Sequence, residues 1–456
     1  MTKYKVYPEY KDSGLSWCDT LPLRWKTSRL RWLSYIYAGG TPSKNVTEYW
    51  DNGTIPWINS GSVNQGYIIE PSEYISKGAY KNSSAKWIPK GSLVLALAGQ
   101  GKTKGMVAQL GIDTTCNQSM AAIVFYEKSQ SRYIYWWLVS NYQNIRNMSG
   151  GDLRDGLNLE VLGGIACPQP SMDESHKIAS FLDHETAKID KLIEKQKQLI
   201  ELLNEKRQAV ISHAVTKGLN PNVPMKDSKN TLLGKIPAHW GLTPMSFLAD
   251  SITVGIVVTP AKYYKDSGVK CFRSLNVGEN TIREQDWVYI SEVSNNLLCK
   301  SKVYTGDILV VRSGQPGTAT VVRDEFCGCN CIDLIIIRRS KRFDSNFICM
   351  QINSPFVKKQ VGMASDGAIQ LHFNVEVAKK LVLTEPPKEE QSEIFNFLSQ
   401  KNKYFDELMK KSELQISLLQ ERRTALISAA VTGKIDVRDW VAPDMQDAEE
   451  PQETTV

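Results

Sequence analysis

The sequence predicts a mixed α/β (α+β) chain in which two globular domains are separated by two long helices. Three observations support this fold class. Residues 171–218 show unbroken helical periodicity, residues 386–433 repeat them, and the segments before the two copies share a series of landmarks. We expect the two long helices to pair as an antiparallel coiled coil, which makes the chain a pseudo-twofold internal repeat.

The helix predicted over residues 171–218 begins with a capping box. Ser171 follows Pro170 directly, and Glu174 stands three residues later. No proline or glycine occurs after that until Gly218, where a helix is expected to stop. Apolar residues recur three and four positions apart along the stretch, which is typical of an amphipathic helix.

The same helix occurs a second time. Residues 202–216 return as residues 418–432, so that equivalent positions lie 216 apart. A helix of this length would extend roughly 70 Å and needs a partner along its side. We expect the two copies to be each other's partners. The residues predicted to pair the helices are Ile189, Leu192, Leu199, Leu203, Phe405, Leu408, Ile416 and Leu419.

The phrase Leu21-Pro22-Leu23-Arg24-Trp25 recurs as Ile236-Pro237-Ala238-His239-Trp240 and marks the entrance to each globular domain. The predicted order is an N-terminal arm (1–20), a first domain (21–167), the central helix (168–218), a linker (219–239), a second domain (240–385), the C-terminal helix (386–433) and a tail (434–456) whose end is expected to be disordered.

Inside each domain the pattern is that of short strands. Residues 92–98 and 307–312 have the composition of buried strands, and each runs into a Gly-Gln turn. Residues 41–87 and 259–302, in contrast, share few residues. The scaffold therefore repeats closely while the globular surfaces differ.

The composition of the chain indicates its cellular compartment and the kind of partner it binds. The chain of 456 residues carries a net charge of +6, which leans mildly toward a polyanionic partner. No apolar run reaches the length needed to cross a bilayer, and the N-terminus has no apolar signal core. Nine cysteines, an odd number with irregular spacing, are typical of reduced thiols. We therefore expect a cytoplasmic protein with no membrane partner.

Two similar domains held apart by a helical strut suit a target with two parts. Double-stranded DNA is such a target, because half-sites repeat about every 34 Å along the duplex. Divergent surfaces on matched scaffolds would read two different half-sites. The paired helices would set the spacing between them.

Several short segments, most of them repeated, resemble those of the specificity subunit of type I restriction-modification systems. They are Asp12-Ser13 followed by the Leu-Pro-x-x-Trp entrance, the turn Gly39-Gly40-Thr41-Pro42, the Pro-x-Pro helix entrance and the Leu-Leu-x-Glu-[Lys/Arg]-Arg helix end. The resemblance covers nearly the whole chain in the right order. The sequence departs from it in Glu174-Ser175, where the second copy has Glu390-Gln391, and in Val258-Thr259-Pro260, which replaces the Gly-Gly-Thr-Pro turn.

The resemblance implies a non-catalytic subunit whose target-recognition domains each read half of an asymmetric, interrupted DNA site. It implies that the helices dock two methyltransferase (M) subunits and that restriction (R) subunits join the complex. No cofactor is expected in this chain, since S-adenosylmethionine, ATP and Mg²⁺ are expected on the partner subunits. Two alternatives remain open: a structural coiled-coil adaptor, and a DNA-modifying enzyme in its own right.

Readout of base edges requires arginine, lysine, amide or hydroxyl side chains on loops or helix ends. Such residues cluster near glycines, where backbone can approach a phosphate. The predicted DNA-binding residues are Lys44, Asn59, Ser60, Asn64, Gln100, Lys102 and Lys104 in the first domain, and Lys262, Arg273, Asn276, Arg312, Ser313 and Gln315 in the second.

Two other signals are set aside. Residues 96–103 fit a relaxed phosphate-loop pattern, but the residues that follow do not predict a helix, and the repeat copy lacks the lysine. Cys327, Cys329 and Cys331 are expected to share one face of a strand, yet they lack the Cys-x-x-Cys spacing of zinc sites. We therefore predict no metal ligands and no catalytic residues.

Overall fold

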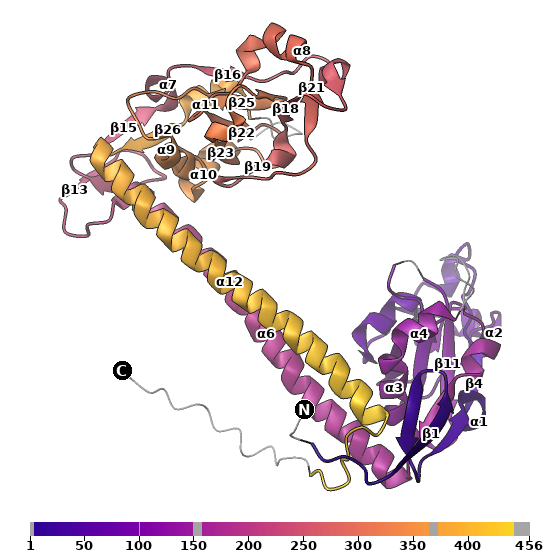
Figure 1. Ribbon diagram of the computed structural model, residues 1–456. Helices are drawn as coiled ribbons and strands as arrows, with labels where there is room; N and C mark the ends of the chain where they lie inside the picture. The colour runs from indigo at the N-terminus through magenta and orange to yellow at the C-terminus, as the bar shows by residue number, and fades with distance from the viewer. Residues whose placement is uncertain (1–3, 100, 149–156, 364–372, 442–456) are drawn as a thin grey trace. The chain divides into compact units, whose positions relative to one another are not determined.

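The computed structural model describes residues 4–99, 101–148, 157–363 and 373–441 (Figure 1). The chain divides into two compact units. Unit 1 comprises Met1–Gln196 with Leu414–Val456, and unit 2 comprises Lys197–Glu413. Each unit therefore contains one globular domain together with half of each long helix.

The two long helices are α6 (Met172–Lys217) and α12 (Lys388–Val431), magenta and yellow in Figure 1. Each is followed by a glycine with a positive φ, +77° at Gly218 and +70° at Gly433. Glycine adopts this left-handed conformation without steric cost, so both helices end where the sequence predicts a stop.

In unit 1 a five-stranded sheet has the order β4–β11–β8–β9–β6 and a three-stranded sheet has the order β10–β5–β7. The strand bounds are β4 (Ser34–Ala38), β5 (Ile55–Ile58), β6 (Tyr67–Ile68), β7 (Glu73–Ile75), β8 (Leu93–Ala96), β9 (Val107–Leu110), β10 (Thr115–Cys116) and β11 (Met120–Phe125). Most neighbours are antiparallel, whereas β10 runs parallel to β5 and β6 runs parallel to β9.

Unit 2 repeats this topology. One sheet has the order β16–β25–β22–β23, which matches β4–β11–β8–β9, and the other has the order β17–β21–β18–β24. The strand bounds are β16 (Ile252–Val254), β17 (Tyr264–Lys265), β18 (Val269–Phe272), β21 (Val288–Ile290), β22 (Ile308–Val311), β23 (Ala319–Val321), β24 (Asn330–Cys331) and β25 (Leu334–Ile337). The parallel pair β18–β24 is the counterpart of β5–β10. The structure confirms a mixed α/β fold with an internal repeat.

Short strands connect each domain to its long helix. In unit 1 β3 (Lys26–Arg29) pairs with β12 (Ala166–Gln169), which leads into α6. In unit 2 β15 (Gly241–Pro244) pairs with β26 (Val382–Glu385), which leads into α12. The remaining strands are β1 (Tyr10–Leu15), β2 (Cys18–Pro22), β13 (Met225–Asp227), β14 (Lys235–Pro237), β19 (Val277–Gly278) and β20 (Thr281–Ile282).

The shorter helices occur in the same order in both domains. Their bounds are α1 (Leu30–Leu33), α2 (Lys77–Lys81), α3 (Ser131–Ser140), α4 (Tyr142–Asn147) and α5 (Leu159–Gly163) in unit 1, and α7 (Met245–Leu248), α8 (Glu292–Leu297), α9 (Ser345–Ile352), α10 (Pro355–Met363) and α11 (Val375–Lys380) in unit 2. In the core of unit 1, Leu95 and Ile123 of the sheet pack with Trp137 of α3 and Phe181 of α6. The long helix is thus part of the domain core at its start.

Within each unit the two helix halves run antiparallel. In unit 1 the guanidinium of Arg423 donates to both carboxylate oxygens of Asp190 at 2.8 and 3.1 Å. In unit 2 the guanidinium of Arg207 donates to Asp406 at 2.6 Å and to Asn402 at 3.1 Å. Asp190 and Asp406 are repeat equivalents, as are Arg207 and Arg423, so the same ion pair forms in each unit.

The structure differs from the predicted pairing surface at two positions. Leu192 and Leu199 are 49% and 42% exposed, whereas the adjacent Ile193 is buried. A stripe of helical spacing accommodates either of two neighbouring residues, and the packing places Ile193 inward. The other predicted pairing residues are buried or half-buried: Ile189, Leu203, Phe405, Leu408, Ile416 and Leu419.

Two terminal segments differ from the sequence-based description. The segment predicted as an N-terminal arm contains β1 and most of β2, which form a hairpin. At the predicted tail, Ile435 and Val437 are buried in the core of unit 1. The expected disorder at the end of the tail concerns residues 442–456, which lie outside the described residues. Among the helices of the described part of the chain, none is long and apolar enough to cross a membrane.

Candidate nucleic-acid interface

The loop that follows β8 is held in place by α4. The guanidinium of Arg146 donates to the carbonyl oxygen of Gly101 at 2.6 Å and to that of Lys104 at 3.4 Å. The hydroxyl of Tyr142 donates to the carbonyl oxygen of Lys102 at 2.5 Å. Three backbone carbonyls are therefore fixed by two side chains of one helix, and the loop has a defined shape.

Two glycines allow this shape. Gly101 and Gly105 have φ values of +66° and +83°. A Cβ on Gly105 would lie 3.2 Å from the backbone nitrogen of Arg146, so the loop approaches α4 more closely than a larger residue would allow. Lys102 is exposed at the tip. The arrangement presents one cation on a rigid loop, which suits a contact with a DNA phosphate.

The equivalent loop of unit 2 follows β22. The guanidinium of Arg312 contacts a carboxylate oxygen of Asp333 at 2.5 Å and donates to the carbonyl oxygen of Phe373 at 3.3 Å. Gly317 packs against Val361 of α10, as Gly105 packs against α4. Gln315 at the tip is exposed. The loop recurs, but five residues separate β22 from Gly317 where eight separate β8 from Gly105. Gln315 follows the repeated glycine, as Gln100 does in unit 1, so Lys102 has no counterpart among the residues at the tip.

A second candidate loop in unit 1 lies after β5. The side chain of Asn59 accepts a hydrogen bond from the backbone of Gly61 at 2.8 Å and caps the 3₁₀ helix η2 (Ser60–Gln65). Asn64 is exposed and donates to the carbonyl oxygen of Gly61 at 2.9 Å. The amide of Asn59 thus shapes the loop, while Asn64 and the half-buried Ser60 are accessible from solvent.

The counterpart in unit 2 has a different organisation. Asn276 is fully buried, and its side chain binds the backbone of Arg273, Arg283 and Gln285 at 2.7–3.2 Å. Arg273 is half-buried and donates to the carbonyl oxygen of Asp286 at 2.5 Å. Asn276 therefore has a structural role, because its donors and acceptor are used inside the protein.

The predicted residues separate into accessible and buried groups. Lys104 is buried, like Asn276, so neither side chain is presented to a ligand from the surface. Ser313 is half-buried, and Gln100 lies outside the described residues. The exposed members of the predicted set are Lys44, Asn64, Lys102, Lys262 and Gln315. The ammonium of Lys262 lies 4.7 Å from the ring centre of Tyr263.

Sequence reasoning missed Tyr142 and Arg146. Both belong to a short helix without a recognisable motif, and their partners lie about 40 residues earlier in the chain. No local pattern in the sequence indicates that either side chain anchors a loop.

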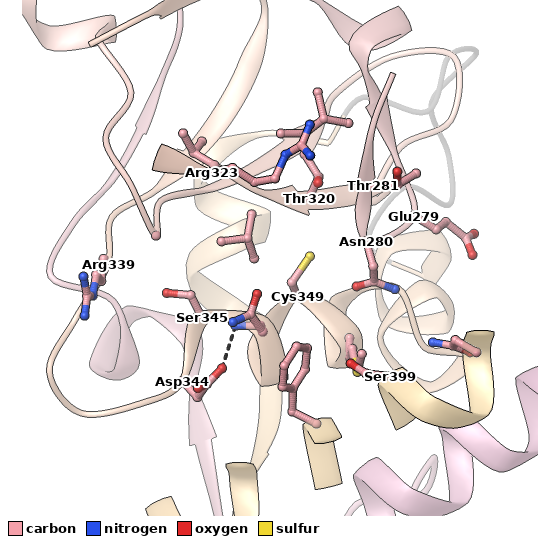
Figure 2. Close-up of a pocket in the computed structure, with 18 of the residues that line it drawn as sticks. Glu279, Asn280, Thr281, Thr320, Arg323, Arg339, Asp344, Ser345, Cys349 and Ser399 are labelled. Carbon is pink, nitrogen blue, oxygen red and sulfur yellow. Dashed lines mark hydrogen bonds between the residues drawn. The ribbon is translucent and has the colours of Figure 1, made fainter. Parts of the chain in front are cut away.

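Unit 2 also contains a broad groove of about 1680 Å³ (Figure 2). Its walls come from the domain and from the helix pair of the same unit. Arg323, Arg339 and Asp344 lie around it, together with Thr281 and Ser345 (Figure 2). The groove is larger than the cavities of roughly 300–1,000 Å³ that hold small molecules. Its size and mixed charge suit a macromolecular surface.

The cysteines do not gather into a metal site. In the described part of the chain, no group of three or more His, Cys, Asp or Glu residues is arranged to hold a metal ion. Cys327 is exposed and Cys331 is buried, which differs from the expectation that Cys327, Cys329 and Cys331 share one face of a strand. Only Cys331 belongs to a strand, so the period-two rule does not apply. Burial raises the pKa of the Cys116 and Cys271 thiols to about 12.

Comparison with known proteins gives a consistent result. Residues 22–202 match the model of the family described as type I restriction modification DNA specificity domain. The chain is 31% identical over 183 residues to the EcoR124I/EcoR124II specificity subunit of Escherichia coli, covering 39% of this chain and 44% of that protein. It is 29% identical to the MjaIX specificity subunit of Methanocaldococcus jannaschii, covering 45% and 46%. The chain thus spans about half the length of these curated relatives.

Solved structures agree on the fold. A chain from work described as the structural basis of complex assembly and conformational transition of the type I R-M system has a TM-score of 0.71 at 15% identity, covering 91% of this chain and 99% of that one. The HsdS subunit from Thermoanaerobacter tengcongensis has a TM-score of 0.52 at 14% identity, covering 91% and 98%. The resemblance found in the sequence is confirmed.

Proposed function

We propose that this chain, whose residues 22–202 belong to the type I restriction modification DNA specificity family, is the sequence-specificity subunit of a type I restriction-modification system. Each domain reads one half of an asymmetric, interrupted DNA site. The observation that carries this proposal is the contrast between the repeated strand order and the unlike loops. Two domains that share a strand order but carry different loops suit a DNA target made of two different halves.

The loop after β8 supports a direct contact with DNA in the first domain. Lys102 is exposed on a loop that α4 holds by three hydrogen bonds. A rigid loop loses little conformational freedom on binding, so its cation contributes more of its attraction to affinity. In the second domain the exposed Gln315 lies on the loop that follows β22, and an amide is suited to reading base edges.

The long helices dock the methyltransferase subunits in this proposal. Leu192 in unit 1 and Leu199 in unit 2 are directed to solvent instead of into the helix pair. Leu418 in unit 1 and Leu202 in unit 2, which are repeat equivalents, are also more than half exposed. Exposed leucines on a helix of this kind suit a partner that covers them. Their recurrence in both units fits two copies of one partner.

The chain itself is non-catalytic in this proposal. The M subunits bind S-adenosylmethionine and methylate adenine, which requires the base to be flipped out of the duplex. The R subunits bind ATP and Mg²⁺ and join the same complex. The specificity subunit determines the DNA sequence at which these partners act.

Modification-sensitive genome sequencing of the host, with and without this gene, tests the proposal. Loss of methyl-adenine from one interrupted, asymmetric motif is the expected result, and re-expression of the chain should restore it. If the motif remained methylated in the deletion strain while the M subunits were expressed, the proposal would be wrong.

A further inference from the structure

An exposed aromatic side chain occurs at the same place in both domains. Trp32, the third residue of α1, is 71% exposed, and Phe247, the third residue of α7, is 67% exposed. No hydrogen bond or ring contact involves either side chain within the described residues. Both rings are therefore available to a ligand from solvent.

The two positions are equivalent in structure as well as in sequence. The first residue of α1, Leu30, donates its backbone N–H to the carbonyl oxygen of Ile165 at 2.8 Å. The first residue of α7, Met245, donates to the carbonyl oxygen of Leu381 at the same distance. Ile165 and Leu381 each directly precede the strand that leads into a long helix. The local frame that carries the aromatic ring is thus the same in both domains.

A single exposed aromatic side chain is ordinary on a protein surface. Its repetition needs a reason, because burial in a core explains neither ring. Readout of DNA does not explain it either, since the proposed half-sites differ. Residues 41–87 and 259–302 share few residues, as expected of surfaces that recognise different half-sites. A side chain that both domains keep and expose suits something that both halves of the complex have in common.

The location of the two rings agrees with this reasoning. α1 follows β3, which pairs with β12 immediately before α6. α7 follows β15, which pairs with β26 immediately before α12. Each ring therefore lies about one short strand, roughly 13 Å, from the start of a long helix. This is the repeated scaffold side of the domain, continuous with the helices proposed to dock the methyltransferase.

We propose that Trp32 and Phe247 are docking anchors, each of which inserts into an apolar pocket on one copy of the methyltransferase subunit. The inference rests on the proposed function and deepens it. Large aromatic side chains are enriched among the residues that dominate interface affinity, because they bury much area at small entropic cost. The partner is expected to offer the same pocket twice, once to each domain.

The test uses the full chain with its co-encoded methyltransferase subunit, measured by native mass spectrometry and by titration calorimetry. Wild type is expected to bind two copies. Trp32→Ala and Phe247→Ala should each bind one copy normally and the second about tenfold or more weakly, as for truncation of a dominant anchor. The double variant should lose both strong sites.

Two kinds of variant keep the result interpretable. Trp32→Phe and Phe247→Trp exchange the two aromatic residues that the chain itself uses, and both should retain binding. Tyr126→Ala removes an aromatic ring that is 67% exposed but is not repeated, since Arg338 to Ser340 follow the equivalent strand β25. This control should bind two copies at wild-type affinity.

A double variant that binds two copies with wild-type affinity would overturn the inference and leave the proposed function intact. Normal binding of the methyltransferase together with weakened DNA binding would also overturn it, in favour of a DNA contact. Failure of wild type to bind any copy would instead contradict the proposed function itself.

Discussion

The indole Nε1 of Trp25 donates a hydrogen bond to a carboxylate oxygen of Glu174 at 3.1 Å, in the first turn of α6. The ring of Trp25 also covers Gly433, the residue that ends α12, because a Cβ added there would lie 3.3 Å from the indole. One buried side chain thus joins the domain of unit 1 to the start of one long helix and to the end of the other.

Unit 2 repeats the arrangement. Trp240 Nε1 donates to Glu390 at 3.0 Å in the first turn of α12, and its ring lies 3.2 Å from the position of a Cβ on Gly218. His239 adds a second contact to the same carboxylate at 2.9 Å. The tryptophan of the entrance phrase is therefore the residue through which each domain is fixed to the helical scaffold.

We expect Trp25→Phe to destabilise unit 1 by about 1.5–3 kcal/mol, the range for a hydrogen bond to a charged group. Hydrogen exchange read by mass spectrometry should show faster exchange in the first domain and at the start of α6. Trp240→Phe is the matched control and should act on unit 2. Equal acceleration in both units by either variant would contradict the local role of these residues.

The ion pair between Asp190 and Arg423 is expected to contribute little, because both side chains are partly exposed. A double-mutant cycle with Asp190→Asn and Arg423→Gln should give a coupling free energy of about 0.2–1 kcal/mol, decreasing with added salt. The double variant Asp190→Arg with Arg423→Asp exchanges the two charges and should keep most of this coupling free energy. Coupling above about 3 kcal/mol would show that solvent screens the pair far less than its exposure indicates.

The general architecture could be predicted from the sequence because it repeats. Two copies of a long helical pattern, each ending at a glycine, are sufficient to identify α6 and α12. The direction of individual side chains could not be predicted in the same way. Leu192 and Ile193 both fit a stripe of helical spacing, and only packing selects Ile193 for the interior.

The candidate site was predictable only in part, since loop residues were chosen by type and by nearby glycines. That criterion finds Lys102 at an exposed tip, but it also selects Asn276, whose amide is used inside the protein. The loop anchors Tyr142 and Arg146 leave no local pattern, because hydrogen bonds between distant segments depend on the fold.

Lys102→Ala should weaken binding of duplex DNA similarly at all sequences. Removal of one phosphate contact is expected to lower the slope of log affinity against log salt by about 1. Fluorescence anisotropy at several salt concentrations measures this. Lys128→Ala, which removes an exposed lysine outside the loop, should leave the slope unchanged. An unchanged slope in Lys102→Ala would remove this residue from the interface.

Arg146→Met should have a different effect, because the charge of Lys102 stays while its loop loses two hydrogen bonds. We expect weaker binding together with faster hydrogen exchange of residues 101–105. Tyr142→Phe should show the same effect to a smaller extent. Weaker binding without any change of exchange in the loop would indicate that Arg146 contacts DNA itself.

The buried thiols predict selective alkylation and a loss of stability at alkaline pH. Burial raises the pKa of Cys116 to about 12, so its thiolate is scarce at pH 8. The exposed Cys299 and Cys327 should react with iodoacetamide first, as mapped by mass spectrometry. Rapid labelling of Cys116 in the folded protein at pH 8 would contradict its burial.

The sign of the pH dependence follows from the raised pKa. The unfolded thiol ionises near its ordinary pKa of about 9, whereas the folded thiol does so near 12. The stabilising contribution is therefore complete below pH 9 and is lost as the pH rises toward 12. Denaturant unfolding between pH 8 and pH 11 should show decreasing stability, and Cys116→Ala should reduce that decrease.

Replacement of residues 21–167 by the corresponding domain of another specificity subunit, followed by sequencing of methylated adenines in the host, tests the central claim most directly. We expect a new interrupted motif in which one half has changed while the half read by residues 240–385 remains the same. A motif changed in both halves would contradict the assignment of one domain to one half-site.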